Sequence, residues 1–299
     1  MARPAVIMDR LFLIGGALIT ALIFGILMLL IGDLVQHGLH RLSWSFIQNF
    51  PSRFPEKAGI LSAWVGSLLV VLVTMLTALP IGIASGVYLE EYAPKNRLTA
   101  VIEINIANLA GVPSIIWGLM ALGLFIYVCG FGHSVLTAGF TLGLLVLPIV
   151  IISTREAIRT VPRRIREASL ALGATKWQTI RHHVLPYSMG GILTGAIISI
   201  SRALGETAPL ITIGALTYVA FLPSSPISAS YPFVSAEPFA WLFSGFTVLP
   251  IQMFNWVSRP QAAFHENAAA AGLVLLMITL TLNVTAIILR SRFRKRVKW

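Results

Sequence analysis

The residues best suited to binding an anion stand together in one otherwise apolar segment of the chain. Arg202 and Glu206 lie four positions apart, so they would share one face of a helix, and Thr207 follows directly. Arginine is permanently charged and can hold a phosphate group through two parallel hydrogen bonds. Glu206 could hold Arg202 while a site is empty and release it to an arriving anion. A structural ion pair that neutralises itself and packs the helices would account for the same residues.

A second polar group, formed by Glu103, Asn105 and Asn108, occurs in another apolar region. These side chains could line an inner gate, although polarity where a helix leaves a membrane accounts for them more simply. His182 and His183 are adjacent, so they face different sides of a helix and make a poor metal pair. The sequence has no zinc-type spacing and no phosphate-cradling glycine loop, so we expect no metal, no bound ATP and no other cofactor.

Composition places these residues in a membrane. Of the 299 residues, 57% are hydrophobic and 11% are charged, whereas about a quarter of a soluble domain is charged. A helix that crosses a bilayer core needs about 20 apolar residues. The regions that meet this requirement predict six spans: 11–31, part of 58–88, 98–128, 135–153, about 188–216 and 268–289. Pro80 should kink the second helix or end its membrane part, and Pro113 divides the third region. Cys129 is the only cysteine in the sequence, so an intrachain disulfide is excluded, and we expect this side chain to be buried.

The basic residues indicate the orientation of these spans. Of the 22 lysines and arginines, 17 lie in the N-terminus, the C-terminus and the loops after the second and fourth spans. The positive-inside rule places those segments, and so both termini, in the cytoplasm. This topology explains the net charge of +11 without a nucleic-acid partner. Region 11–31 is long for a signal peptide and lacks a cleavage site, so we expect it to be retained. The chain then divides into a first helix with its outer loop (1–58), a membrane core (59–290) and a basic cytoplasmic tail (291–299).

The cytoplasmic loop after the fourth span, about 155–186, predicts two short amphipathic helices joined by a sharp bend. Gly173 suits the left-handed position that follows a helix end. Thr175 and Gln178 form a capping box that starts the second helix, and Pro186 should end it. The apolar stripes of the two helices run through Ile165, Ala168 and Leu172, and then Trp177, Ile180 and Val184. Helices this short need a surface to pack on, either a partner or the membrane.

This loop resembles the EAA loop of permeases in binding-protein-dependent ABC importers. The family pattern is EAA, three residues, G, nine residues, an apolar residue, one residue and LP. Glu167, Ala168, Ser169 and Gly173 stand at the matching spacing, with Ser169 in place of the second alanine and His183 in place of an aliphatic residue. The resemblance implies a coupling helix that docks in a groove of an ATPase subunit. It also implies an all-α polytopic membrane protein with six transmembrane helices, the type I (MetI-like) importer permease fold, and a transport subunit that is not an enzyme.

The segment around Arg202 sharpens the resemblance. Residues 201–209, SRALGETAP, look like the signature of phosphate-specific ABC permeases. Segments 88–94 and 104–114 and the outer loop from 249 to 266 resemble the same family, specifically its A-type permeases. The resemblance covers nearly everything from residue 59 onward and little of 1–57. It implies that Arg202, Glu206 and Thr207 lie on the path of phosphate.

The resemblance also implies the partners of the chain. These would be a sister permease, a dimer of ATPase subunits that uses ATP and Mg²⁺, an extracytoplasmic phosphate-binding protein, and the lipid of the plasma membrane. The outer loop 217–267 would meet the binding protein, although a self-packed lid fits its residues equally well. Three alternatives remain: an ABC permease for another oxyanion such as molybdate or sulfate, an ion channel or secondary carrier, and a scaffold or sensor subunit. The coupling loop argues against the channel or carrier.

Overall fold

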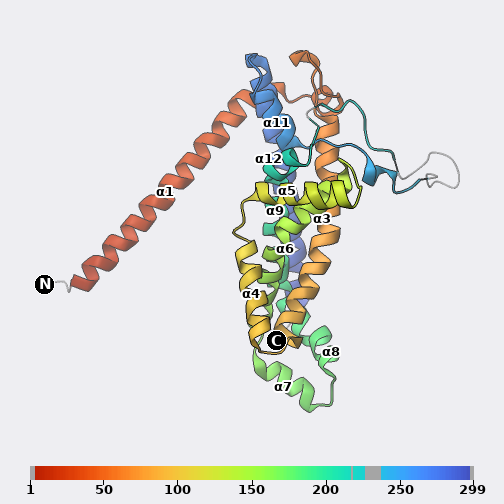
Figure 1. Ribbon diagram of the computed structural model, residues 1–299. Coiled ribbons are helices and arrows are strands. Elements are labelled where there is room, and N and C mark those ends of the chain that lie inside the picture. Colours follow the sequence, from red (N-terminus) through yellow and green to blue (C-terminus); the bar gives the residue numbers. More distant parts are fainter. Residues whose placement is uncertain (1–3, 217, 226–236, 297–299) are drawn as a thin grey trace.

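Three long helices pack lengthwise at the centre of the molecule. The computed structural model describes residues 4–216, 218–225 and 237–296, and every regular element in these ranges is helical (Figure 1). The central helices are α3 (Leu61–Val87), α6 (Val135–Arg159) and α9 (Leu185–Gly205). Glycines let them approach, since a Cβ at Gly139 would collide with Val73 and one at Gly195 with Ser153.

Two of these helices run further than the apolar pattern suggests. Pro80 lies inside α3 and does not end it, and the chain continues as a π-helical turn, η3 (Tyr88–Tyr92). Helix α6 continues past the predicted end at residue 153 as far as Arg159. A helix does not have to stop where the membrane does, because its backbone hydrogen bonds are internal. The extensions carry charged side chains beyond the apolar core.

The third predicted span is bent. Helix α4 (Arg97–Leu109) and helix α5 (Ser114–Ala121), which continues as the π-helical turn η4 (Leu122–Val128), meet at 105°. Pro113 stands directly before α5, and a proline disfavours helical geometry in the residue that precedes it. Five of the described helices are long and apolar enough to cross a membrane, and this bent pair has the composition of either a broken sixth span or a re-entrant loop.

The fifth predicted span begins earlier and ends earlier than expected. Helix α8 (Lys176–Thr179), the π-helical turn η5 (Ile180–Val184) and α9 follow one another without interruption. The prediction that Pro186 ends the second loop helix is therefore wrong. Pro186 sits in the first turn of α9, after the wider turn of η5, where its missing N–H is tolerated. At the other end, α9 stops at Gly205, and a short helix, α10 (Ala208–Thr212), follows.

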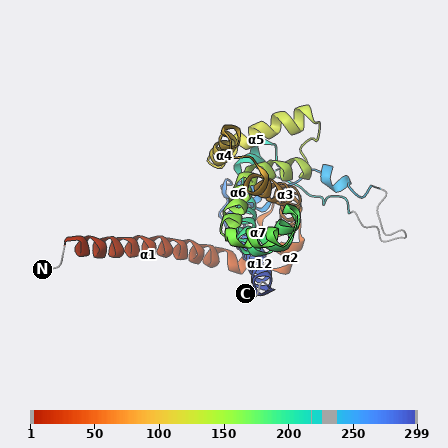
Figure 2. The same ribbon diagram turned by 90° about the horizontal axis from the view of Figure 1, so that it is seen from below.

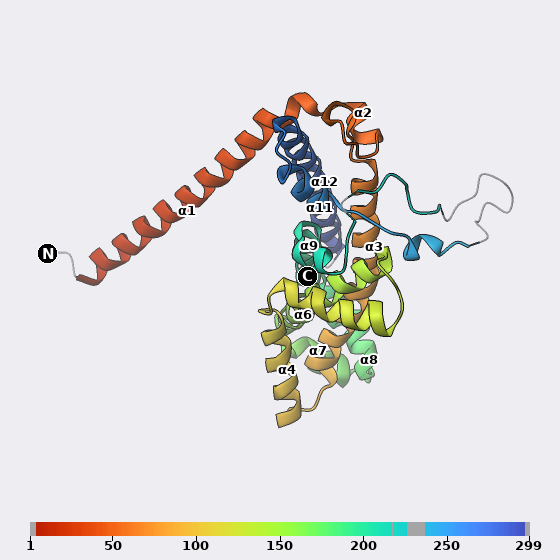
Figure 3. The ribbon, with the colours of Figure 1, turned by 45° about the horizontal axis from the view of Figure 1, so that its top comes forward.

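The first helix stands apart from the rest of the chain. Helix α1 (Pro4–Gly38) leaves the bundle at an angle, and only its C-terminal end packs against α12 (Ala262–Arg296), near Gly38 and Ala269 (Figures 2 and 3). Its most apolar stretch has no buried residue within this chain. A fully exposed apolar helix requires lipid or another membrane helix around it.

The two ends of the bundle are built differently. At one end lie α7 (Arg163–Ala171) and α8, and at the other lie α11 (Leu249–Val257) and α2 (Trp44–Gln48) (Figure 1). Phe46, Trp256 and Phe264 form the apolar core of the second end. The short helices η1 (Leu39–Arg41), η2 (Pro55–Lys57) and η6 (Ala240–Phe243) belong to the segments that connect the long helices. The two-helix loop of α7 and α8 and the cluster of Phe46, Trp256 and Phe264, which we call the aromatic cap, therefore lie at opposite ends of the bundle (Figure 1).

Candidate functional site

Arg202 and Glu206 flank the break that ends α9. Arg202 lies in the last turn of the helix, whereas Glu206 is the first residue beyond it and has extended backbone geometry. The Arg202 Nε atom nevertheless donates a hydrogen bond to Glu206 Oε1 over 3.3 Å. Thr207 follows as the residue before α10, and its carbonyl accepts hydrogen bonds from Leu210 and Ile211. The predicted pair therefore forms, although the two residues do not share a continuous helix.

The packing of α9 turns Arg202 away from the core of this chain. The Ser201 hydroxyl bonds Asn283 of α12 over 2.7 Å, and both Ala203 and Leu204 are buried. These contacts fix the rotation of the helix. The Arg202 side chain is left 40% exposed, whereas the Glu206 side chain is 17% exposed. An arginine at the end of an apolar helix thus faces outward with a single long hydrogen bond.

The two broken spans meet at their breaks. Helix α5, just after the 105° bend, packs on α10, just after the end of α9. Gly118 makes this contact possible, because a Cβ there would collide with the Thr212 side chain and the backbone of Pro209. In membrane transporters, interrupted helices expose backbone groups where a substrate has to be held. Arg202, Glu206 and Thr207 therefore lie at a helix break, which is a geometry suited to substrate binding.

The loop at the other end of α9 has the predicted two-helix shape. Gly173 adopts a left-handed backbone, with φ of 86°, and Thr175 and Gln178 make both hydrogen bonds of the capping box. A hydroxyl pair between Ser169 and Thr179, 2.9 Å apart and buried, joins α7 to α8. These three predictions of local structure, the bend, the capping box and the second helix start, are confirmed.

The apolar side chains of this loop divide into two sets. Ile180 and Val184 are buried, as predicted, against Val87, Ile158 and Val161. Of the predicted stripe on α7, Ile165 packs inward, whereas Ala168 and Leu172 are exposed in this chain, so packing of those two residues on a partner or the membrane stays a prediction. The Ser169–Thr179 contact rotates α7 so that Ser169, not Ala168, faces the bundle. His183 is exposed, so its departure from the family pattern leaves the packing undisturbed.

The exposed set forms an apolar tip. Leu172 is 90% exposed, Trp177 54% and Leu170 49%. A helical loop with three large apolar side chains at its tip is expected to bury them against a partner. The tip, defined as Leu170, Leu172 and Trp177, is therefore a candidate docking surface. Glu167 lies beside it on the same helix and lines the cavity described next.

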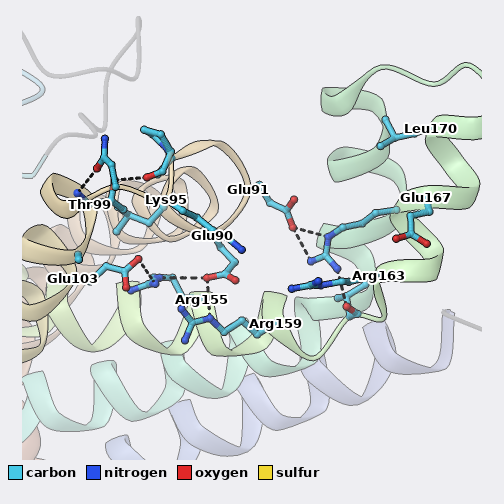
Figure 4. Close-up of a pocket in the computed structure, with 17 residues that line it drawn as sticks. Glu90, Glu91, Lys95, Thr99, Glu103, Arg155, Arg159, Arg163, Glu167 and Leu170 are labelled. Carbon is cyan, nitrogen blue, oxygen red and sulfur yellow. Dashed lines mark hydrogen bonds and ion pairs between the residues drawn. The ribbon is translucent and has the colours of Figure 1, made fainter.

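A cavity of about 880 Å³ lies between α7 and the ends of α3, α4 and α6 (Figure 4). Oppositely charged side chains from four elements meet in it. Arg155 Nη2 lies 2.6 Å from Glu103 Oε1, and Arg155 Nε lies 3.6 Å from Glu90 Oε2. Glu90 also accepts a hydrogen bond from Arg159 over 2.9 Å. We call Arg155, Arg159, Glu90 and Glu103 the charge cluster.

A second contact set ties α7 to the end of α3. Arg166 of α7 donates two hydrogen bonds to Glu91 of η3, over 2.7 and 2.9 Å, and others to the carbonyls of Ile158 and Val161. The Lys176 ammonium lies 4.8 Å from the centre of the Tyr92 ring. The acidic segment after the second span is thus held by the two-helix loop. Sequence reasoning missed both sets, although acidic residues after one span and basic residues after another were a usable signal.

The remaining candidate residues named from the sequence do not form one site. Asn105 and Asn108 are exposed, and Asn105 donates to the carbonyl of Val101 on its own helix. The structure does not bring them together with Glu103, which turns toward Arg155. Cys129 is exposed, contrary to the prediction, because the helix ends at Val128 and Cys129 falls in the following turn. Within the described residues no cluster of histidine, cysteine and acidic side chains could hold a metal ion.

Comparison with known sequences extends over most of the chain. The profile of the family described as "Binding-protein-dependent transport system inner membrane component" matches residues 78–299. "Probable ABC transporter permease protein YqgI" of Bacillus subtilis (strain 168) is 32% identical over 270 residues, which cover 90% of each chain. "Phosphate transport system permease protein PstA" of Pasteurella multocida (strain Pm70) is 32% identical over 271 residues, 89% of each chain. "Phosphate transport system permease protein PstA 1" of Mycobacterium tuberculosis (strain CDC 1551 / Oshkosh) is 33% identical over 238 residues, 79% of this chain and 72% of that protein.

Solved structures with a similar arrangement of helices include two transporters. A chain of a bacterial alginate ABC transporter in complex with an alginate pentasaccharide-bound periplasmic protein has a TM-score of 0.63 at 13% identity, covering 95% of this chain and 96% of that one. A chain of the MetNI methionine ABC transporter, in an inward-facing conformation, has a TM-score of 0.55 at 17% identity, covering 78% of this chain and 95% of that one. At these identities the likeness extends to the fold alone.

Proposed function

The chain belongs to the family of binding-protein-dependent transport system inner membrane components, and from that premise we propose that it is the A-type permease of an ATP-driven importer of inorganic phosphate. The predicted type I importer permease fold is confirmed, with the third span as a bent pair. As a permease of this family the chain is a multi-pass transport subunit without catalytic activity, and ATP is used by a separate ATPase subunit. Phosphate is supported by relatives named as phosphate permeases, whereas the name of the Bacillus relative states no substrate.

The observation that carries the proposal is the position of Arg202. It lies where two broken spans meet, and within the part of the chain that the structure describes its ion-pair partner is Glu206, at 3.3 Å. The contact is long and leaves the Arg202 side chain 40% exposed, so an incoming anion can compete with Glu206 for the guanidinium. A planar guanidinium then offers two parallel donors to a phosphate. In the proposed cycle, Glu206 occupies Arg202 in the empty path and releases it to phosphate.

The outward direction of Arg202 supports a path shared with a second subunit. Because its side chain is 40% exposed and faces away from this chain's own core, another protein has to enclose it within a membrane. A sister permease, which the importer family employs, would complete the path on this side. The outer loop 217–267 would receive phosphate from the extracytoplasmic binding protein. Thr217 and residues 226–236 of that loop lie outside the described residues.

The two-helix loop supports the proposed attachment to an ATPase dimer. Its bend is held by the Ser169–Thr179 pair and by the left-handed Gly173, so the apolar tip is presented rigidly. Tryptophan is a typical anchor of protein interfaces, and the two exposed leucines add apolar area beside Trp177. Glu167, Ala168, Ser169 and Gly173, the residues of the family motif, shape or flank this tip. The loop would therefore sit in a groove of the ATPase as the coupling helix.

Replacement of Arg202 tests the proposed phosphate path. A hydrogen bond to a charged group contributes about 1.5–3 kcal/mol, so Arg202→Gln should lower phosphate uptake by roughly tenfold or more. Uptake is measured in vesicles that contain the reconstituted complex, with ATP hydrolysis followed in parallel. The ATPase should remain assembled and active, because Arg202 is remote from the coupling loop.

The matched control is Arg53→Gln, which removes an arginine from the outer loop and should leave uptake unchanged. Equal uptake by the Arg202→Gln complex and the unaltered complex would mean that Arg202 and Glu206 are only structural. Competition distinguishes the other oxyanions: an excess of molybdate or sulfate should not reduce phosphate uptake. A complex that imports molybdate or sulfate in preference to phosphate would refute the phosphate assignment and leave the permease assignment intact.

A further inference from the structure

Helix α4 is attached to the bundle in an unusual way. None of its residues is buried, whereas the central helices α3, α6 and α9 each bury several apolar side chains. Among the described residues its only ion pair joins Glu103 to Arg155 of α6, with Nη2 and Oε1 2.6 Å apart. Because α4 buries no side chain, we take this ion pair as the main side-chain contact that attaches α4, the cytoplasmic half of the bent span, to α6.

The partner of Glu103 is the least exposed arginine in the charge cluster. The Arg155 side chain is 9% exposed, against 46% for Arg159. Two carboxylates face it, Glu103 of α4 and Glu90 of η3, and Arg159 shares Glu90 (Figure 4). A guanidinium this deeply buried requires a carboxylate partner, because an unpaired buried charge is strongly unfavourable. Any movement of Arg155 must therefore carry a carboxylate with it.

Both carboxylates lie close to the Arg155 guanidinium at the same time. Neither Nε nor Nη2 of Arg155 makes a well-aligned hydrogen bond within the described chain, although Nη2 lies 2.6 Å from Glu103 and Nε lies 3.6 Å from Glu90. The pairs are held by charge attraction more than by directed hydrogen bonds. The guanidinium can therefore move by a small distance together with Glu103 and remain paired.

Arg155 is placed where the coupling loop begins. It lies in the last turns of α6, and the chain passes from that helix through Thr160 to α7. Arg166 of α7 is in turn bonded to Glu91, the neighbour of Glu90. A displacement of α7 by a docked ATPase therefore acts directly on the end of α6 that carries Arg155. Beyond the bend of the same span, α5 packs on α10, next to Arg202 and Glu206.

We propose that Arg155 is a positioning residue that transmits movement of the coupling loop to α4 through its ion pair with Glu103. When the ATPase closes, the end of α6 moves, and Glu103 draws the cytoplasmic half of the bent span with it. Helix α5 then shifts against α10 and alters the anion path. This inference rests on the proposed docking of the loop to an ATPase but not on phosphate as the substrate.

Charge reversal tests the ion pair in the full reconstituted complex. The Glu103→Arg variant and the Arg155→Glu variant should each retain ATP hydrolysis but lower the substrate imported per ATP hydrolysed by roughly tenfold or more. The double variant Glu103→Arg/Arg155→Glu restores the ion pair with its charges exchanged. It should recover most of the substrate import per ATP hydrolysed. Glu90 keeps Arg159 as its partner in that variant. Glu103→Gln serves as the probe if the single reversals fail to assemble.

The matched control is Glu156→Arg, the same charge change one residue away from Arg155. The Glu156 side chain is 63% exposed, and its one ion pair among the residues with described positions is with Arg159, along the helix surface. This variant should keep the normal ratio of import to ATP hydrolysis. If Glu156→Arg lowers the ratio of import to ATP hydrolysis as much as Glu103→Arg does, the effect arises from the net charge of this region and the inference is wrong.

A distance measurement makes the test independent of the substrate. In a Cys129→Ala background, spin labels at Asn108→Cys on α4 and Val284→Cys on α12 report the position of α4 with and without ATP. The unaltered pair should show a nucleotide-dependent change in distance, which Glu103→Arg abolishes and the double variant restores. An unchanged response in Glu103→Arg would overturn the inference. Absence of phosphate uptake by the unaltered complex would refute only the proposed substrate.

Discussion

Two arginines of the same chain are suited to opposite tasks because their surroundings differ. Arg202 is 40% exposed and holds Glu206 through one hydrogen bond of 3.3 Å, whereas Arg155 is 9% exposed between two carboxylates. Exposed pairs contribute about 0–1 kcal/mol, but removing one partner from a buried pair costs about 3–5 kcal/mol. Arg202 can therefore exchange its partner for a substrate, while Arg155 has to remain paired and is suited to transmitting force.

At the residue scale, Gly118 should determine whether the two broken spans can touch. A Cβ at this position would collide with Thr212 and with the backbone of Pro209. Overpacking of this kind destabilises a structure by about 1–3 kcal/mol. Gly118→Ala should therefore lower the thermal stability of the purified chain and reduce uptake, since α5 and α10 would separate. Unfolding is followed by heating the detergent-solubilised protein.

Gly123 provides the control for this change. It lies in the continuation of the same helix, and a Cβ there would meet no atom within 4 Å. Gly123→Ala should leave both stability and uptake unchanged. Equal behaviour of the two alanine variants would show that the close approach at Gly118 is not required.

At the element scale, the two-helix loop of α7 and α8 shows how short helices acquire a defined shape. Its bend depends on local signals, the left-handed Gly173 and the Thr175–Gln178 capping box. Its attachment depends on Ile180 and Val184, which fill the space between the ends of α3 and α6. The apolar tip takes no part in either function. Its side chains are therefore free to contact a partner without any cost to the fold.

The tip provides the prediction at this scale. Leu172 is 90% exposed, so Leu172→Asp should not alter the folded chain. Loss of an anchor in an interface costs about 2 kcal/mol or more, and an acidic group there also has to be desolvated, so the amount of co-purified ATPase should fall by roughly tenfold or more. Leu172→Met keeps the apolar contact and should retain the ATPase. Full retention by the Asp variant would place the docking surface elsewhere.

At the scale of the whole molecule, the arrangement of helices separates the two ends of the transporter. The coupling loop lies at one end of the bundle and the aromatic cap with α11 at the other (Figure 1). Helix α1 projects from the bundle with an apolar surface that this chain does not cover. Such a surface is stable only in lipid or against another subunit. We therefore expect the apolar surface of α1 to lie in lipid or against another subunit.

The predicted orientation can be tested by labelling from either side of the membrane. In a Cys129→Ala background, Ala171→Cys on α7 should react with a membrane-impermeant maleimide only in inside-out vesicles. Ser258→Cys, after α11, should react only in right-side-out vesicles. The physical reason is the excess of lysine and arginine on the α7 side, which the positive-inside rule assigns to the cytoplasm. Reversed labelling of the two variants would invert the proposed topology.

Much of the architecture can be predicted from the sequence because the relevant properties are local. Apolar length identifies the spans, since every stretch that must satisfy its backbone in lipid becomes a helix. The left-handed Gly173 and the capping box are visible for the same reason, because each depends on residues only a few positions apart. The family motif in the loop and the arginine within an apolar span also required no tertiary information. These features determined the membrane class, the coupling loop and the first candidate site.

Only the tertiary structure decided which distant residues meet. Arg155, Glu90 and Glu103 come from three separate helical elements, and their pairing depends on how those helices pack and rotate about their axes. The faces of α7 that this chain covers also came from the structure, since the buried hydroxyl pair of Ser169 and Thr179 sets the rotation of α7 and leaves Ala168 and Leu172 exposed. Pro113 indicated a break in the third span, whereas the 105° angle of the bend and the end of α9 at Gly205 came only from the structure. Periodicity determines which helices exist, whereas packing determines which faces they present.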